Sequence, residues 1–237
     1  DLQVLVDAQG RVACAACDCS GHPAYTGAAR LECRDAVVSP GLINPHEHVT
    51  FSASGPVAPR TERYEHRHDW RTGRNGHTRL TAPPSGNASA VRWTELRHLL
   101  AGSTSINGSG SAAGLVRNLD RPAHLEGLSG RGVMYSTFPL GDTGGTTLTN
   151  GCAYPSLDTP ADLSAVDAYT PHVSEGIDAA AYNEFQCLSG VGAGATLVVT
   201  PKTAIIHGLG LRAADLATMA TAGASLIWSP RSNLDLY

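Results

Sequence analysis

Apolar residues along this chain occur in short runs of strand length. Positions 2–7 and 11–16 alternate apolar residues with polar or small ones on either side of a turn at Gly10, which is typical of a β-hairpin. A further apolar run at 31–38 predicts another strand. We therefore expect residues 1–40 to form a small layer of β-structure.

From residue 41 onwards, strand-like runs alternate with stretches of helical periodicity. The predicted strands are 41–48, 103–107, 132–138, 168–173, 204–207 and 224–228. The predicted helices are 90–100, 177–188 and 213–222. This alternation is typical of βα units around a parallel sheet. An α/β fold follows, in which 41–237 supplies the first six to seven units of a (β/α)8 barrel that closes only with eight strands.

Two segments do not follow this alternation. Residues 52–87 are polar, lack periodicity and are rich in Arg, His, Gly and Pro, so we predict a long loop that serves as a lid or pocket wall. Residues 229–237 are predicted to be a loop directly after a strand. Because the barrel still lacks a strand there, we expect a C-terminal fragment or separate chain to complete it.

Composition narrows the range of partners. The 237 residues carry a net charge of −4, and the 17 basic side chains are scattered among 21 acidic ones. Nucleic acid is therefore not an expected partner, because binding it requires a basic stripe. A membrane span is not predicted either, because no apolar run approaches the ~20 residues it needs.

The six cysteines predict disulfide bonds. They are Cys14, Cys17, Cys19, Cys33, Cys152 and Cys187. An even set, with four members in the first 33 residues, favours an extracytoplasmic compartment, periplasmic or secreted, over the cytoplasm. The alternative is a structural zinc site at the C-x-x-C-x-C run of residues 14–19, which lacks the separated second pair of a zinc ribbon.

The most informative motif is His-x-His at the end of the predicted strand 41–48. Side chains alternate along a strand with a period of two, so His46 and His48 lie on the same face and can bind one metal ion. Neutral imidazole suits zinc or iron. The carboxyl end of a barrel strand is also where barrel active sites form.

Residues 40–48 resemble the Pro-Gly-φ-φ-(Asp/Asn)-x-His-x-His signature of the amidohydrolase superfamily, and the resemblance extends over nearly the whole chain. It implies a β-sandwich beside a distorted (β/α)8 barrel. On that basis residues 1–40 are part of the sandwich domain, and 41–237 are barrel units.

Later motifs resemble the aminohydrolase branch, which includes cytosine and guanine deaminases, triazine hydrolases and imidazolonepropionases. The His-x-x-Glu of His172 and Glu175 implies a third metal ligand and a proton shuttle. His207, in a His-Gly pair on the sixth strand, is implied to bind the metal or to hydrogen-bond the water and substrate. Residues 229–234 resemble the Pro-x-Ser-Asn segment that shapes the pocket floor, which makes Asn233 a candidate substrate contact.

The resemblance implies a hydrolase that cleaves a C–N bond with metal-activated water, by deaminating a heterocyclic amine or opening a cyclic amide. One zinc ion per complete barrel is expected, with iron as the other option. Binuclear members carry a bridging lysine on strand four, whereas Lys202, the only lysine, precedes strand six. The strand-eight Asp that acts as general base is expected beyond Tyr237, so this chain alone is predicted to be inactive.

Four further side chains are candidate contacts for a small-molecule substrate. His66 and His68 form a second His-x-His within the polar segment, where an auxiliary metal is the alternative role. Arg117 and Asp142 fall in the loops expected after the third and fourth strands, where capping and turn roles are equally compatible.

Two other functions stay open from the sequence. One is a binuclear cyclic imidase, lactonase or dipeptidase that uses another bridging ligand, such as Cys152. The other is a secreted, non-catalytic binding protein built on a dead barrel. Self-association of the chain is compatible with each of these functions.

Overall fold

The computed structural model describes residues 2–33, 36–51, 61–81 and 86–237. The chain divides into two compact units, Asp1–Pro40 and Gly41–Tyr237, at the boundary expected from the sequence. Each unit is described separately below.

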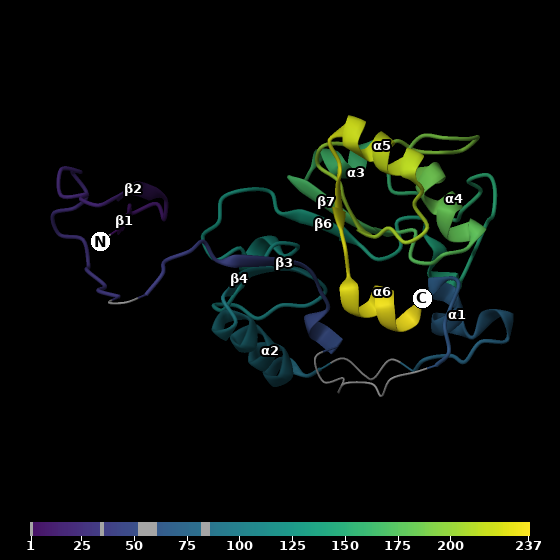
Figure 1. Ribbon diagram of the computed structural model, residues 1–237, viewed down its shortest axis with the longest axis horizontal. Helices are drawn as coiled ribbons and strands as arrows, with labels where there is room; N and C mark the ends of the chain where they lie inside the picture. Colours follow the sequence, from purple (N-terminus) through teal and green to yellow (C-terminus); the bar gives the residue numbers. More distant parts are fainter. Residues whose placement is uncertain (1, 34–35, 52–60, 82–85) are drawn as a thin grey trace. The chain divides into compact units, whose positions relative to one another are not determined.

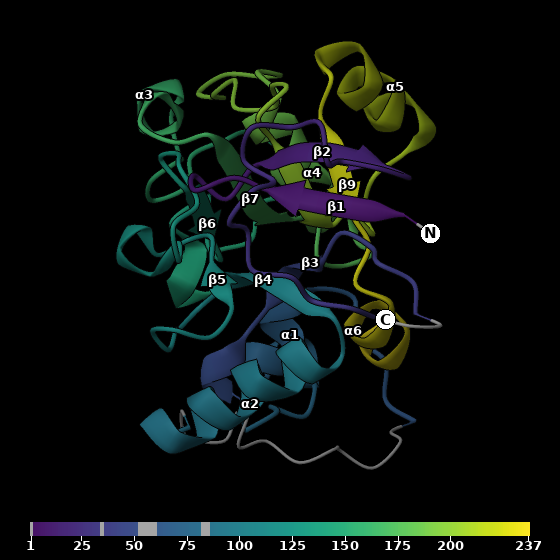
Figure 2. The same cartoon turned by 90° about the vertical axis from the view of Figure 1, so that its left-hand side faces the viewer.

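The first unit contains the predicted hairpin. Strands β1 (Gln3–Val6) and β2 (Val12–Ala16) pair antiparallel, and Figure 2 shows them side by side. The turn is held by Asp7, whose carboxylate accepts the backbone N–H groups of Gln9 and Arg11, both at 2.9 Å. Gly10 supplies the left-handed conformation that the turn requires, with φ of 75°.

The prediction of a strand at 31–38 is wrong for the described residues of that range. Residues 31–33 and 36–38 are irregular, and positions 34 and 35 lie outside the described part of the chain. Leu31 and Val37 are 88% and 93% exposed. The described residues of this run pair with no strand and leave Leu31 and Val37 exposed, because apolar character alone does not form a strand.

The second unit is a mixed α/β structure with two parallel sheets (Figure 1). The first sheet contains β3 (Leu42–Glu47), β4 (Ser103–Gly108) and β5 (Arg117–Asn118). The second contains β6 (Val133–Ser136), β7 (Ala168–Val173), β8 (Ala204–His207) and β9 (Ser225–Ile227). Neighbouring strands follow chain order in both sheets, so the predicted parallel α/β arrangement is confirmed. The described strands do not close into a barrel.

The three predicted helices are present, and three more were not predicted. The predicted ones are α2 (Ala88–Leu100), α4 (Ala179–Leu188) and α5 (Ala213–Ala222). The others are α1 (Arg67–Thr72), α3 (Pro160–Ser164) and α6 (Pro230–Leu236). Short 3-10 turns complete the described elements: η1 (Val49–Phe51), η2 (Arg74–Gly76), η3 (Pro122–His124) and η4 (Asp142–Gly144).

The prediction of loops at 52–87 and 229–237 is therefore corrected by α1 and α6. Both helices are too short to show a helical period in the sequence. Their start signals are local: His66 and Asp69 form a capping box at the start of α1, and Pro230 occupies the first turn of α6. Residues 52–60 and 82–85 of the predicted loop lie outside the described residues.

The main core of the second unit lies around the sheet β6–β9. Tyr169 and Val173 of β7 pack with Ile205 of β8 and with Phe185 and Leu188 of α4, and all five are at most 1% exposed. This packing fixes the carboxyl ends of β7 and β8 against each other, which is where the candidate site lies.

Two disulfide bonds form, Cys14–Cys19 in the hairpin unit and Cys152–Cys187 in the main core. Cys17 and Cys33 are free and exposed. Pairing of Cys14 with Cys19 removes the cysteine set of the alternative zinc site at residues 14–19. Two disulfides point to an oxidising, extracytoplasmic compartment.

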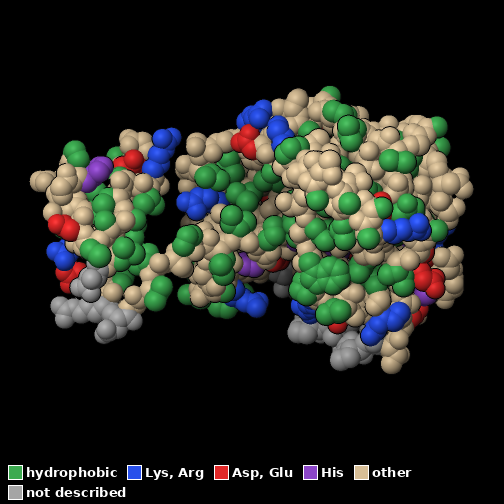
Figure 3. Space-filling view, turned by 45° about the horizontal axis from the view of Figure 1, so that its top comes forward, with side chains coloured by type: hydrophobic (Ala, Val, Ile, Leu, Met, Phe, Trp, Pro, Cys, Tyr) green, Lys and Arg blue, Asp and Glu red, His purple; other side chains and the backbone are tan. Residues whose placement is uncertain are grey.

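The charged side chains are mixed on the visible surface. On the face in Figure 3, basic and acidic side chains are interspersed and form no large patch of one sign. Among the described residues, no helix is long and apolar enough to cross a membrane.

Candidate metal centre

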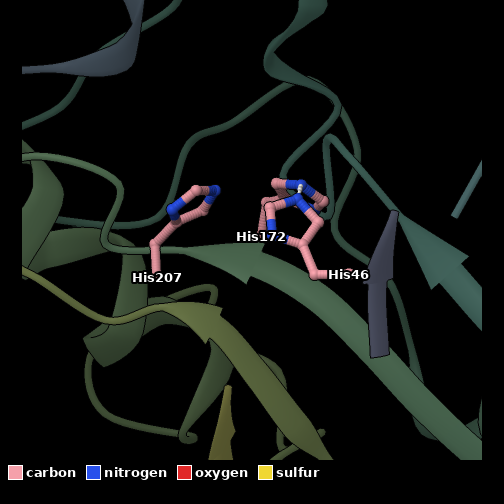
Figure 4. Close-up of side chains that lie close together, drawn as sticks. All are labelled: His46, His172 and His207. Atoms are coloured by element: carbon pink, nitrogen blue, oxygen red, sulfur yellow. Dashed lines mark hydrogen bonds between the residues drawn. The ribbon is translucent and has the colours of Figure 1, made fainter. Parts of the chain in front are cut away.

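Four histidines meet at the carboxyl ends of three parallel strands. His46 is in β3 and His48 directly follows it, His172 is in β7, and His207 ends β8. Figure 4 shows the rings of His46 and His172 against each other, with the ring of His207 turned towards them. The sequence prediction that strands far apart in the chain bring these imidazoles together agrees with this geometry.

The ring nitrogens are close enough to share one ion. The Nε2 atom of His46 lies 3.0 Å from Nε2 of His48 and 3.1 Å from Nε2 of His172. Ligand atoms of His46, His172 and His207 all lie within 4.8 Å of one another. Nitrogens bound to a tetrahedral zinc at ~2.0–2.1 Å are about 3.3 Å apart, which is close to the two distances measured from His46.

Burial keeps these imidazoles in the form that binds metals. Desolvation, with smaller contributions from the neighbouring His207 and His48, lowers the pKa of His46 to about 3. Desolvation also lowers the pKa of His48, and it lowers the pKa of His172 well below its ordinary value. All three rings are therefore neutral at pH 7, and a neutral imidazole has the lone pair that a metal requires.

The outer ring nitrogens have partners that leave Nε2 free to face the centre. His172 donates from Nδ1 to the carbonyl oxygen of Ser136 at 3.3 Å, since a carbonyl only accepts. Nδ1 of His207 lies 2.8 Å from Oδ1 of Asn233. An outer partner of this kind fixes the tautomer and orientation of a histidine that binds a metal.

Tyr135 belongs to the same cluster, although the sequence analysis did not single it out. Its hydroxyl lies 3.0 Å from Nε2 of His48 and 3.4 Å from Nε2 of His172. Burial raises the pKa of Tyr135, so the phenol stays protonated and can donate a hydrogen bond into the centre. In the sequence, the only feature that pointed to Tyr135 was its position within the strand predicted at 132–138.

Glu175 supplies the nearest carboxylate. Its Oε2 atom lies 3.6 Å from Nε2 of His207, which is longer than a hydrogen bond. Its Oε1 atom accepts the hydroxyl of Tyr237 at 3.1 Å, and Tyr237 in turn accepts the indole N–H of Trp70 at 2.9 Å. One carboxylate oxygen is thus held in place, and the other faces the histidines.

Two residues at the strand ends have a strained backbone. Ser174 and His207 have φ of 55° and 76°, in the left-handed region that favours glycine. Such residues cost about 1–3 kcal/mol each and persist only where the surroundings hold them, often at functional sites. At Ser174 the restraint is Glu184, whose Oε2 atom accepts the Ser174 backbone N–H at 2.7 Å.

The predicted substrate contacts His66, His68 and Asp142 lie in a buried network around Arg67. Arg67 is 1% exposed and pairs with Asp142 at 2.5 Å and with Glu184 at 3.3 Å. His68 bonds the same Asp142 oxygen at 2.8 Å, and His66 faces Glu184 at 3.2 Å.

This network holds the carboxyl ends of β6 and β7. A guanidinium nitrogen of Arg67 donates to the carbonyl of Thr137 at 2.9 Å, and its backbone N–H donates to the carbonyl of Glu175, also at 2.9 Å. The network around Arg67 therefore supports the candidate site by holding the backbone at the ends of these two strands. Contact of His66, His68 or Asp142 with a substrate stays a prediction.

The other two candidates differ in their surroundings. Asn233 is 3% exposed and contacts His207. Arg117 is half-buried on β5, and among the described residues no hydrogen bond or ion pair joins it to the histidines. A role of Arg117 in substrate binding stays a prediction.

A second group, Glu65, Asp69 and His77, also brings ligand atoms together. Asp69 is already engaged in the capping box of α1, because it accepts the backbone N–H groups of Glu65 and His66. A hydrogen bond to Glu62 at 3.1 Å raises the pKa of His77. His77 is thus already hydrogen-bonded to Glu62 and lies 3.8 Å from Glu65 and 3.9 Å from Asp69.

We expect the buried network to make the fold sensitive to acid. Burial alone would raise the pKa of Asp142, but the bond from His68 and the charge of Arg67 outweigh it and lower the pKa. A carboxyl with a lowered pKa adds stability above its unfolded pKa of about 3.9, and this stability is lost as the pH falls through the folded pKa. Asp142→Asn should therefore lower the free energy of unfolding by about 3 kcal/mol at pH 7, and by less below pH 4.

Urea unfolding at pH 7 and at pH 3 measures this difference. The matched control is Asp167→Asn, which removes an exposed ion pair with Arg131 and should cost less than about 1 kcal/mol. Equal effects of the two variants at pH 7 would show that the Asp142 pair contributes no more than a surface pair.

No known family model, curated protein or solved structure matches this chain. Function is therefore inferred from the side chains themselves. They combine neutral imidazoles with converging nitrogens, a carboxylate facing them, and a protonated phenol.

Proposed function

We propose that this chain carries the metal centre of a hydrolase that uses water to cleave a C–N bond in a small molecule, by deaminating a heterocyclic amine or opening a cyclic amide. The observation that supports this most is the convergence of the imidazoles of His46, His172 and His207, with His48 at 3.0 Å from His46 and the carboxylate of Glu175 facing His207 at 3.6 Å. Zinc suits this nitrogen-rich set, and iron is the second option.

Each side chain has a distinct task in this proposal. His46, His48 and His172 hold one ion, and His207 either joins them as a ligand or polarises the substrate. When bound, a divalent ion of this kind lowers the pKa of a water molecule towards 7 and polarises the bond under attack.

The proton is carried by Glu175. Its Oε1 atom is occupied by the hydroxyl of Tyr237, so Oε2 is the atom that accepts a proton near the histidines and returns it to the leaving nitrogen. The hydroxyl of Tyr135 points at the same centre and, as a donor, stabilises negative charge that develops on the substrate.

We further propose that a second polypeptide segment completes the sheet and supplies the general base. Each of the two sheets has open edges among the described residues: β3 and β5 in the first, β6 and β9 in the second. Leu42 and Ile43 of β3 are 62% and 61% exposed, and Leu226 of β9 is 41% exposed. Burial of such side chains contributes about 1.5–3 kcal/mol each, which favours a covering segment.

Metal content tests the proposal directly. After dialysis against zinc and then metal-free buffer, we expect about one zinc ion per chain, measured by elemental analysis. Cys17 and Cys33 are free and exposed, so Cys17→Ser and Cys33→Ser are introduced first to remove thiols that bind zinc.

Ammonia release and ring opening are then screened with heterocyclic amines and cyclic amides, once the completing segment is present. Two ions per chain would favour the binuclear alternative. Retention of no ion would contradict the proposal and favour a non-catalytic binding protein.

A further inference from the structure

One face of α6 reaches three members of the candidate site. Ser229, Asn233 and Tyr237 are spaced four residues apart, so they share one face of this helix and its caps. Ser229 Oγ lies 2.5 Å from Nδ1 of His46, and Asn233 Oδ1 lies 2.8 Å from Nδ1 of His207. Tyr237 donates to Glu175 at 3.1 Å.

The contact of Asn233 fixes where the proton of His207 resides. The Asn233 amide N–H donates to the backbone carbonyl of His207 at 3.5 Å, so its oxygen is the atom that faces the ring. An amide oxygen only accepts, and Nδ1 of His207 must therefore carry the hydrogen. The lone pair of a neutral His207 is then on Nε2, the atom that faces the centre.

Ser229 acts on His46 in a comparable way. A hydroxyl can accept from Nδ1, which leaves the lone pair of His46 on Nε2, between His48 and His172. Ser229 is 9% exposed and Asn233 is 3% exposed, so water does not readily replace either partner.

We propose that Ser229 and Asn233 are positioning residues of the metal centre, through which α6 sets the proton location and ring orientation of His46 and His207. The inference rests on the proposed function, because it requires these histidines to bind an ion. Loss of an outer partner of this kind typically weakens metal binding by about ten- to a hundredfold.

The test is the affinity of the chain for Zn²⁺ and Co²⁺, measured by competition with a chelator in the Cys17→Ser, Cys33→Ser background. Ser229→Ala and Asn233→Leu should each raise Kd by about ten- to a hundredfold and alter the visible absorption of bound Co²⁺. Asn233→Asp should keep Kd within a few-fold of the parent, because a carboxylate still accepts from Nδ1.

The matched controls are Ser232→Ala and Leu234→Ala on the same helix. Leu234 is 65% exposed, and the Ser232 hydroxyl donates to the backbone carbonyl of Ser229 at 3.4 Å. Both should leave Kd and the Co²⁺ spectrum unchanged, which separates positioning from mere stability of the helix.

The outcomes distinguish this inference from the proposed function. If the parent binds neither ion, both fail. If the parent binds an ion and either Ser229→Ala or Asn233→Leu has the parent's Kd and spectrum, only the inference is overturned. Equal weakening in the two control variants also overturns it, because α6 would then act through stability alone.

Discussion

Replacing His46 with alanine is expected to abolish retention of zinc by the chain. Nε2 of His46 is within 3.1 Å of the corresponding atoms of both His48 and His172, so it occupies the middle of the donor set. Protein zinc sites gain about 10–16 kcal/mol from four ligands, so the loss of one should raise Kd on the order of a hundred- to a thousandfold. No other described histidine is placed to substitute for it.

Elemental analysis after dialysis and chelator competition measure this loss. The control is His22→Ala in the hairpin unit, where His22 accepts a backbone N–H from Ala24 and takes no part in the centre. Far-UV circular dichroism checks that both variants are folded. Zinc retention by His46→Ala at the parent's level would rule out the assigned centre.

Glu175→Gln should keep the metal and lose turnover. Glutamine keeps the shape of the side chain, and its oxygen still accepts the hydroxyl of Tyr237, so the histidines should stay in place. It cannot carry a proton between water and the leaving nitrogen. General acid–base catalysis contributes about 10²- to 10⁴-fold, and kcat should fall by that factor.

This measurement requires the completed protein and a substrate identified in the screen. Metal content is determined on the same sample, so loss of the ion is not mistaken for loss of the proton carrier. Glu126→Gln, which alters an exposed carboxylate bonded to the backbone of Gly114, is the control. Full activity of Glu175→Gln would remove the role assigned to Glu175.

The sequence predicted the strands that carry the histidines because their signal is local. Apolar runs of four to six residues define β7 and β8, and a period of two places His46 and His48 on one face. The carboxyl ends of β7 and β8 lie at one edge because these strands are neighbours in one parallel sheet. β3 belongs to the other sheet, so the meeting of His46 with His172 and His207 depends on how the two sheets pack.

The supporting contacts could not be predicted in this way, because they depend on tertiary structure. Tyr135 and Ser229 are ordinary strand and loop residues until the chain folds around His48 and His46. The charges of Arg67 and Asp142 are 75 residues apart and become partners only in the buried network. The polar composition of residues 52–87 predicted a lid or pocket wall, whereas Arg67 of that segment is buried and pairs with Asp142 and Glu184.

The two disulfides differ in their chemical accessibility. Cys152–Cys187 is enclosed by the main core, so soluble thiols reach it only when that core opens. Cys14–Cys19 encloses Cys17, an exposed free thiol two residues from one of its sulfurs in the sequence. As an exposed free thiol, Cys17 can attack this bond by thiol–disulfide exchange, so the free thiols of purified material should be blocked before its cysteine connectivity is mapped.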